Sequence, residues 1–385
     1  MKNLIKKQVS FLIEIENKKH EEFFINEYFD IKGGYYNKKP PAPKKGSVPF
    51  LGASALNNGI TQFSSREDIL KYDKVGDENS SDIEKRFFPP NCLAITNNGS
   101  VGYAYYQEIE FTCSHDITVV YLKEEKIGRS MNKYLATYLI VPFERTGETF
   151  KYSRKWRPKR MIRSKILMPV TDQGTPDWEY MEQQGKRLYE RKQNDIFEYL
   201  KKKQLELKTQ LSKINEPIIE EITWKTFEVE EMFGVKRVSG EPLNKYDEGN
   251  LPFISTSSQK NGVQGFVNSK KEDVSPKNSL TISPIDGTIF FHSYNFVGRG
   301  GAGSSISTMT NENLNKYIGL FIKTMIEASS KHKASYGVQL NGKRLKSTKF
   351  YLPVTDDNEP DWKFMEYYMK KIEYKQISKL IKYLN

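Results

Sequence analysis

Basic side chains are concentrated in two short stretches of the sequence. Residues 151–165, KYSRKWRPKRMIRSK, contain eight Lys or Arg and no acid, and they interleave Tyr152 and Trp156. Residues 331–349, KHKASYGVQLNGKRLKSTK, contain six Lys or Arg. Guanidinium and ammonium groups at this density suit phosphate contacts, and Arg, Gln and Asn can form paired hydrogen bonds with base edges. For either stretch alone, a solvated basic loop is the alternative.

Other chemical signatures in the sequence are weak. The four His and two Cys have no CxxC or HxxxH spacing, so no zinc site is expected. CSHD at 113–116 places a thiol, a base and an acid side by side in the sequence. The members of a catalytic triad converge in space and are rarely neighbours on one strand, so no catalysis is expected there. GRGGAG at 298–303 spells GxGxxG, but a polar stretch follows it where a dinucleotide fold needs an apolar helix. A methyltransferase that modifies amino groups of bases has a loop of the order Asn/Asp-Pro-Pro-aromatic, whereas FPPN at 88–91 has the aromatic residue first. The PD and ExK motifs of one nuclease class also occur, but they fall on predicted helices and are interpreted as solvated helix charges.

The chain contains one unit twice. A shift of 184 places PVTDQGTPDWEYME, 169–182, on PVTDDNEPDWKFME, 353–366, and nine of these fourteen positions are identical. The same shift places Tyr152 on Tyr336, Lys159 on Lys343, Arg160 on Arg344 and Lys165 on Lys349. Further upstream the offset drifts, and the strand at 93–96 followed by Gly99 is matched to the strand at 280–283 followed by Gly287. Because a basic stretch occurs at the same place in both copies, a merely solvated loop becomes a weaker explanation.

Each copy has the pattern of a mostly β module followed by a helix. Short apolar runs alternate with Gly and Asn turns, and a short helix is predicted near NKYLATYLI and its counterpart NKYIGLFIK. From Asp177 to about Ile214 there is no Pro, and apolar residues recur at helical spacing. Pro176 blocks an earlier start, and Asp177 can cap the first free amides. A shorter amphipathic helix is predicted at 361–384, and the narrow apolar stripes predict that the two helices pack as an antiparallel pair.

Composition fits a two-domain protein with a polyanionic partner. The 385 residues have a formal net charge of +12, which by itself is weak support for nucleic-acid binding. The run YLATYLIVPF at 134–143 is too short to cross a bilayer, so no membrane association is expected. With two Cys and no recognisable export signal, the expected location is the reducing cytoplasm.

The two copies differ most in their loops. When the two copies are aligned, NNGS at 97–100 corresponds to PIDGT at 284–288, and Trp156 corresponds to Leu340. A duplicated scaffold with divergent loops is what two different half-sites would need.

This layout resembles the DNA specificity subunit of type I restriction-modification systems. The PVTDxxxPDWxxME exits resemble members that serve type II-like enzymes as separate specificity chains. The resemblance spans nearly the whole chain and implies an α+β fold with two mostly-β target recognition domains in tandem, each followed by a long helix, the two helices forming an antiparallel coiled coil. The implied divisions are an N-terminal segment at 1–20, target recognition domain 1 at 21–172, a central spacer helix at 173–215, target recognition domain 2 at 216–356 and a C-terminal spacer helix at 357–385.

The resemblance also implies a function and its partners. The chain would be a non-catalytic subunit that reads a bipartite, asymmetric target in double-stranded DNA and recruits methyltransferase subunits, with restriction endonuclease subunits as further partners. It would bind no cofactor itself, because S-adenosylmethionine, ATP and Mg²⁺ belong to the partner subunits. Two alternatives stay open. The chain could be a complete DNA methyltransferase or nuclease with an unrecognised active site, or a mimic that captures the methyltransferase without binding DNA.

The family pattern assigns DNA contacts to the basic loop of each domain and to a second loop nearby, and it assigns no catalytic or metal-binding residue. In domain 1 the expected residues are Tyr152, Arg154, Lys155, Arg157, Lys159 and Arg160, with Asn97, Asn98 and Ser100. In domain 2 they are Tyr336, Gln339, Asn341, Lys343 and Arg344, with Asp286 and Thr288.

Overall fold

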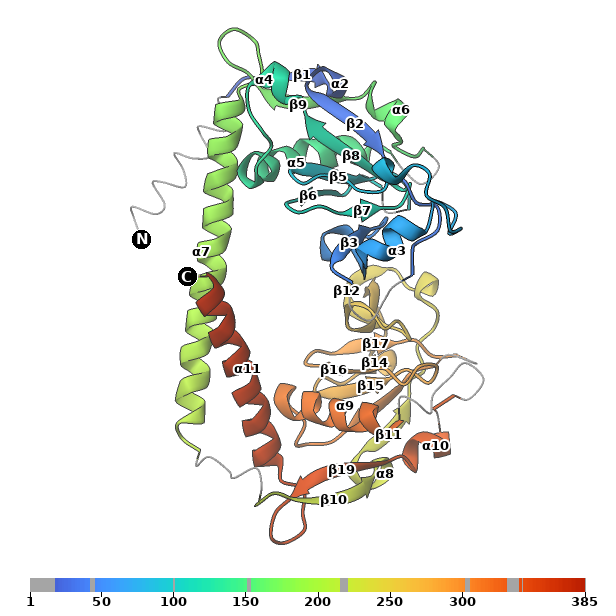
Figure 1. The fold of residues 1–385 in the computed structure, drawn as a ribbon. Coiled ribbons are helices and arrows are strands. Elements are labelled where there is room, and N and C mark those ends of the chain that lie inside the picture. Colours follow the sequence, from blue (N-terminus) through green and yellow to red (C-terminus); the bar gives the residue numbers. More distant parts are fainter. Residues whose placement is uncertain are drawn as a thin grey trace. The chain divides into compact units, whose positions relative to one another are not determined.

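The computed structural model describes most of the chain and divides it into two compact units (Figure 1). The units are Met1–Asp195 and Ile196–Asn385, and the division falls inside the long helix α7 (Trp178–Leu211). Unit 1 contains the first sequence copy, called module 1 (21–172), and unit 2 contains module 2 (216–356). The described residues are 18–41, 46–99, 101–150, 154–214, 221–301, 305–330, 339–340 and 342–384.

Module 1 is built on an antiparallel four-stranded sheet. Its central strand β5 is buried on both faces, which explains the continuous apolar run CLAIT. Leu93 and Ile95 pack into the larger core with the long helix of the module, whereas Cys92 and Ala94 pack into a second core on the other face. The sheet order is β2 (Phe29–Gly33), β8 (Ile117–Leu122), β5 (Cys92–Thr96) and β6 (Ala104–Gln107).

Smaller elements complete module 1. The first strand, β1 (His20–Phe24), pairs antiparallel with the last, β9 (Lys165–Pro169), and this ladder closes the module. A second sheet has the order β4 (Ile60–Ser64), β3 (Val48–Leu51), β7 (Thr112–Cys113). The helices are α2 (Ile25–Tyr28), η1 (Asn57–Gly59), α3 (Arg66–Lys71), η2 (Ile83–Lys85), α4 (Glu124–Ile127), α5 (Lys133–Glu148) and α6 (Pro158–Met161). Helix α5 is longer than the short helix that the sequence predicts, because it continues through Pro142.

Module 2 repeats this arrangement. The closing ladder pairs β10 (Thr223–Glu228) with β19 (Lys349–Val354). The main sheet has the order β11 (Gly234–Arg237), β18 (Ser307–Thr310), β15 (Ser279–Ile282), β16 (Ile289–His292). The second sheet has the order β13 (Val263–Val267), β12 (Glu248–Ile254), β17 (Phe296–Gly298), β14 (Val274–Ser275). The helices are α8 (Val229–Met232), η4 (Leu243–Lys245), η5 (Lys260–Gly262), η6 (Lys271–Asp273), α9 (Lys316–Ser330) and α10 (Gly342–Lys346).

The repeated PVTD…PDW stretch forms the same turn in both units. The Asp177 amide donates to the Pro169 carbonyl at 2.8 Å, and the Asp361 amide donates to the Pro353 carbonyl at 2.8 Å. Each aspartate then caps the helix that follows, because its Oδ1 accepts a backbone N–H three residues later. The turn therefore ends the last strand and sets the start of a helix, α7 in unit 1 and α11 (Trp362–Leu384) in unit 2.

A repeated asparagine connects the module helix to this exit helix. Asn132 caps α5 by accepting the Tyr134 and Leu135 amides, and its Nδ2 donates to Glu182 on α7 at 2.7 Å. Asn315 precedes α9 and accepts two amides in the same way, and its Nδ2 donates to Glu366 on α11 at 3.2 Å. These contacts explain why NKY and the PDWxxME glutamate recur together in the sequence.

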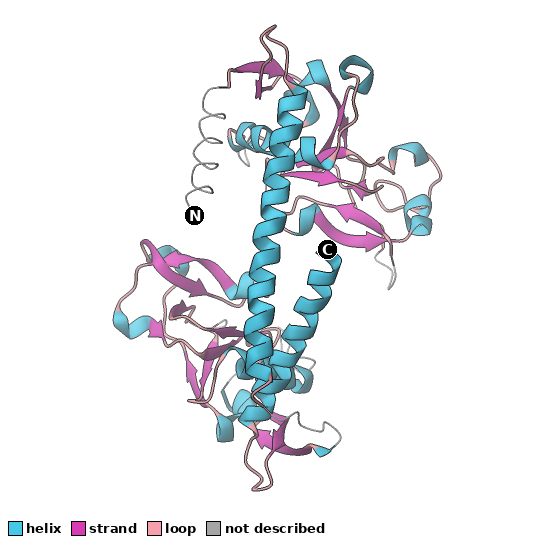
Figure 2. Cartoon of the chain, turned by 90° about the vertical axis from the view of Figure 1, so that its left-hand side faces the viewer, coloured by secondary structure: helices cyan, strands magenta, loops and turns pink. Residues whose placement is uncertain are grey.

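The C-terminal helix packs against the part of α7 that belongs to unit 2, as the apolar stripes predict. Leu200 and Leu207 of α7 form a small core with Ile377 and Ile381 of α11. Beside this core, Gln204 Nε2 donates to Ser378 Oγ at 2.8 Å. Figure 1 shows the two helices running in opposite directions, and Figure 2 shows them side by side. Across the described ranges, no helix is both long and apolar enough to span a membrane.

Candidate nucleic-acid interface

The basic loop of module 1 is anchored by a buried tryptophan. Trp156 is fully buried, its ring stacks on Phe150 at 5.4 Å, and its Nε1 donates to Ser164 Oγ at 2.9 Å. The indole therefore belongs to the core and does not face a ligand, unlike an aromatic residue interleaved for base contacts. Because this anchor fixes the loop from inside, the cations on both sides of it, Arg154 and Arg157, point to solvent.

One arginine braces this loop in each module. Arg160 Nη1 donates to the Lys155 carbonyl at 2.8 Å, and Arg344 Nη1 donates to the Gln339 carbonyl at 3.3 Å. Both arginines are exposed, whereas Lys155 is half-buried; Lys159 is exposed next to Arg160. The arginines stand on short helices, α6 and α10. Each guanidinium has five N–H donors, so the brace leaves donors of Arg160 and Arg344 for a phosphate.

The basic loop of module 2 has an apolar anchor of a different size. Leu340, the counterpart of Trp156, is 3% exposed, and Leu345 on α10 is fully buried beneath the loop. Lys343 and Arg344 lie exposed on the same short helix, and Gln339 is half-buried. The loop is therefore supported from inside in both modules, by a large ring in one and by a smaller side chain in the other.

Some of the residues that the sequence assigns to DNA contact lie outside the described residues. These are Tyr152, Ser100, Tyr336 and Asn341.

The second loop of module 1 turns its asparagines inward. Asn97 is fully buried, and its Nδ2 donates to the His115 carbonyl at 3.2 Å and to Thr118 Oγ1 at 3.0 Å. Asn98 is half-buried, and its Nδ2 donates to Asp116 Oδ1 at 2.7 Å. These amides hold the base of the loop, so neither is presented to a ligand in this conformation.

A pair of glycines joins the end of the second loop of module 1 to helix α5. Gly102 lies at the end of the second loop with φ +95°, and a Cβ there would come within 3.0 Å of the backbone of Gly147. Gly147 lies in the last turn of α5, directly before the basic loop. The close backbone contact, which only glycines allow, holds the end of the second loop against the end of α5, the helix that precedes the basic loop.

Module 2 joins its two loops by a direct hydrogen bond. The Leu340 amide donates to the Pro284 carbonyl at 2.8 Å. In the second loop, Asp286 is half-buried and its Oδ1 accepts the Thr288 amide at 3.1 Å, whereas the Thr288 side chain is buried. Burial opposes ionisation of Asp286, but polar contacts with Ser283 and Thr288 outweigh it and lower the pKa of this carboxyl group. Asp286 is thus an ionised acceptor beside the basic loop.

The structure adds one residue that the sequence comparison missed, Tyr103. The Gly102 amide donates to the Thr96 carbonyl, and the Gly287 amide donates to the Ser283 carbonyl, so Gly102 is the structural counterpart of Gly287. The match of Gly99 with Gly287 is therefore wrong, because the module 1 loop is longer. By the same hydrogen bonds Tyr103 takes the place of Thr288.

Tyr103 gives module 1 an exposed aromatic surface. Its side chain is 42% exposed and stacks on Tyr105, with ring centroids 6.5 Å apart and planes 6° from parallel. Tyr105 Oη donates to the Ser54 carbonyl at 2.9 Å, and burial raises the pKa of Tyr105 to about 12. The alternation in YAYY at 103–106 was the available signal, since it places Tyr103 and Tyr105 on one face of a strand.

The remaining candidates for chemistry do not form a site. Cys113 is fully buried, and burial raises its pKa, so it does not supply a nucleophilic thiolate. His115 is engaged elsewhere, because its Nδ1 lies 3.2 Å from the Tyr36 carbonyl and its Nε2 3.3 Å from Asp116. Among the described residues, no group of three or more His, Cys, Asp or Glu could hold a metal ion.

The duplicated modules, their paired loops and the exit helices define a DNA specificity protein of restriction-modification systems. The sequence model of the type I restriction modification DNA specificity domain matches residues 17–198 and again 221–383. The chain belongs to this family and is a specificity subunit of a restriction-modification system.

Individual proteins similar to this one match over nearly the whole chain. The specificity subunit S.BcgI of a type II restriction enzyme from Heyndrickxia coagulans is 23% identical over 376 residues, which cover 94% of this chain and 96% of that protein. Among solved structures, the type I S subunit from M. genitalium matches with a TM-score of 0.40 and 14% identity, covering 96% of this chain and 93% of that one. The HsdS subunit from Thermoanaerobacter tengcongensis matches with a TM-score of 0.30 and 12% identity, covering 95% of this chain and 90% of that one.

Proposed function

We propose that this specificity subunit reads a bipartite, asymmetric DNA target, with one half-site for each module. The observation that carries the proposal is the loop pair that occurs in both modules with different side chains. Module 1 presents Tyr103 and a dense set of cations, whereas module 2 presents Asp286 and fewer cations. Cations position the phosphate backbone, and the divergent side chains supply base contacts.

The helices are proposed to dock the methyltransferase subunits. Large apolar side chains remain exposed on α11 and on the part of α7 that belongs to unit 2, including Tyr199 at 66% and Tyr383 at 85%. Exposed apolar side chains on paired helices favour a protein partner. On this proposal the chain itself is non-catalytic, S-adenosylmethionine, ATP and Mg²⁺ act in partner subunits, and the complex works on DNA in the cytoplasm, with restriction endonuclease subunits as further partners.

Methylation mapping tests the proposal. Methylated sites are mapped in the host genome with the gene intact, with the gene deleted, and with the two loops of module 1 exchanged for those of module 2. The expected result is loss of one bipartite motif on deletion and conversion of one half-site on exchange. Conversion of both half-sites, or of neither, would contradict the division between modules.

Purified chain separates the alternatives. The chain is incubated with target DNA, S-adenosylmethionine and Mg²⁺ in the absence of other subunits. Methyl transfer or cleavage by the chain alone would show a complete enzyme. In a separate binding assay with the methyltransferase subunit, binding of that subunit without binding of DNA would show a mimic. The proposal expects DNA binding without either reaction.

A further inference from the structure

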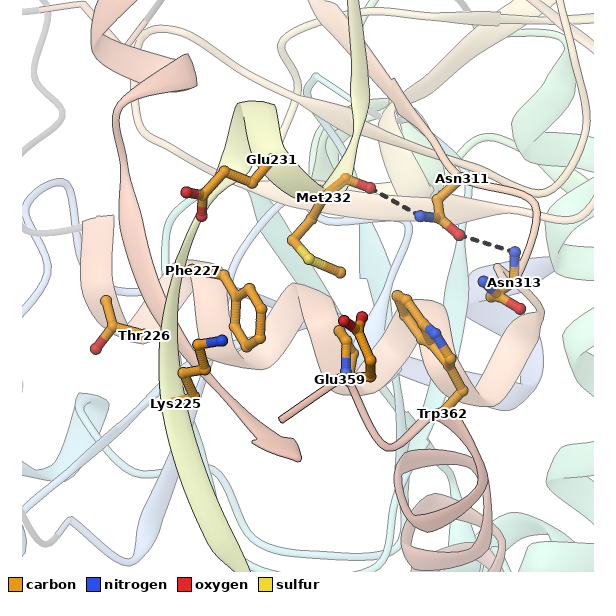
Figure 3. A pocket seen from close by; sticks show the side chains of 10 residues that line it. Lys225, Thr226, Phe227, Glu231, Met232, Asn311, Asn313, Glu359 and Trp362 are labelled. Atoms are coloured by element: carbon orange, nitrogen blue, oxygen red, sulfur yellow. Dashed lines mark hydrogen bonds between the residues drawn. The ribbon is translucent and has the colours of Figure 1, made fainter. Parts of the chain in front are cut away.

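A pocket of about 470 Å³ lies at the base of module 2, where β10, α8 and the exit turn before α11 meet (Figure 3). Phe227, Met232 and Trp362 supply its apolar lining. Lys225 and Glu359 add charged side chains to the lining. We call it the base pocket. Its volume lies within the range of pockets that hold a small molecule.

Module 1 shows what the same position can hold. The repeat places Phe23, Tyr28 and Trp178 where module 2 has Phe227, Met232 and Trp362. The Tyr28 ring lies 5.6 Å from Trp178 and 5.7 Å from Phe23, in edge-to-face geometry with both. In unit 1 an aromatic ring of the chain itself therefore packs against the tryptophan.

Met232 leaves this position open in module 2. Methionine has no ring to reach Trp362, and Met232 is only half-buried. Two hydrogen bonds fix the lining segments: Asn311 Nδ2 donates to the Met232 carbonyl at 2.8 Å, and Lys225 Nζ donates to the Asn358 carbonyl at 3.4 Å. Module 2 thus has a methionine beside Trp362 where module 1 has a tyrosine ring beside Trp178.

We propose that the base pocket binds a tyrosine side chain presented by the modification subunit. This inference rests on the proposed function, since α11 begins at the pocket wall with Trp362 and continues into the helix pair proposed to dock that subunit. The incoming ring packs edge-to-face on Trp362, as Tyr28 does on Trp178. Glu359 in the lining is an acceptor for the phenol O–H.

Binding of p-cresol, the side-chain analogue of tyrosine, tests the pocket in the full-length chain. Met232→Tyr fills the pocket from within, and Met232→Leu is the control that conserves its size. Titration followed by NMR is expected to show binding to the wild type and to Met232→Leu, and about tenfold weaker binding to Met232→Tyr, as for loss of an aromatic anchor. Equal binding to wild type and Met232→Tyr would overturn the proposal.

Assembly with the modification subunit separates the pocket from the helix surface. Calorimetry is performed with Met232→Tyr and, independently, with Leu380→Ala combined with Tyr383→Ala on α11. About tenfold weaker assembly of Met232→Tyr, with Met232→Leu unchanged, supports the base pocket. If only the α11 variant weakens assembly, the docking proposal stands and the base-pocket proposal fails. If neither variant does, both fail.

Discussion

The central strands of the two modules, β5 and β15, carry the same kinds of residue on one face and different kinds on the other. Leu93 and Ile95 of β5 correspond to Leu280 and Ile282 of β15, and both pairs pack into the core that contains the module helix. On the opposite face module 1 has Cys92 and Ala94, whereas module 2 has Ser279 and Thr281. Helix packing constrains the first face in both copies, so within these two strands the residue types diverge on the second face.

The loop surfaces show the same separation between shared support and divergent contacts. The braces formed by Arg160 and Arg344 are equivalent, and so are the caps formed by Asn132 and Asn315. The exposed groups differ in charge and in aromatic character. A duplicated module can therefore change what it reads without changing how it folds.

The largest expected effect comes from removing cations of module 1. The triple variant Arg154→Ala, Arg157→Ala, Lys159→Ala should weaken DNA binding about 100-fold and reduce the slope of log K against log salt by about 2.7, because three phosphate contacts are lost. The control removes three exposed cations from α7, Arg191→Ala, Lys192→Ala and Lys202→Ala. Similar losses in both variants would show that charge acts without regard to position.

Asp286→Asn sharpens the comparison at module 2. If the carboxylate accepts from a base amino group, discrimination at one half-site should change by about 1–3 kcal/mol, with the other half-site unchanged. The pKa of Asp286 is lowered, so this effect should be constant between about pH 6 and 8. Selection of binding sites from a random DNA pool measures it, with Asp356→Asn in the exit turn as the control. A change at both half-sites would argue against separate reading.

The asparagine caps test the shared support. Asn132→Ala and Asn315→Ala should each destabilise their own unit by about 2 kcal/mol, because each loses a cap and a bond to a glutamate. Asn→Asp at the same positions keeps the helix cap but replaces the hydrogen bond to the glutamate with a carboxylate that faces it. The Asp variants therefore separate the contribution of the cap from that of the hydrogen bond. Hydrogen exchange resolves the units. If only one of the two alanine variants destabilises its own unit, the two caps are not equivalent.

His292 distinguishes the modules by pH. Burial lowers the pKa of His292 to about 4, whereas an unfolded histidine titrates near 6.5, so stability falls as the pH decreases through this window. At pH 5.5 the loss is about 1.4 kcal/mol. Gln107 is the counterpart of His292 in module 1. The variant His292→Gln, which introduces this residue type into module 2, should remove the pH dependence of stability measured by urea unfolding. An unchanged slope would assign it to other groups.

The sequence by itself determined the duplication, the exit turns, the helices and the location of the basic loops. These features depend on residue types at fixed spacing, and spacing is visible in the chain. Only the tertiary structure decided that Trp156 and Asn97 face inward, that Gly102 is the counterpart of Gly287, and that Tyr103 is exposed. The physical reason is that burial and backbone pairing arise from contacts between segments far apart in sequence, which local pattern does not specify.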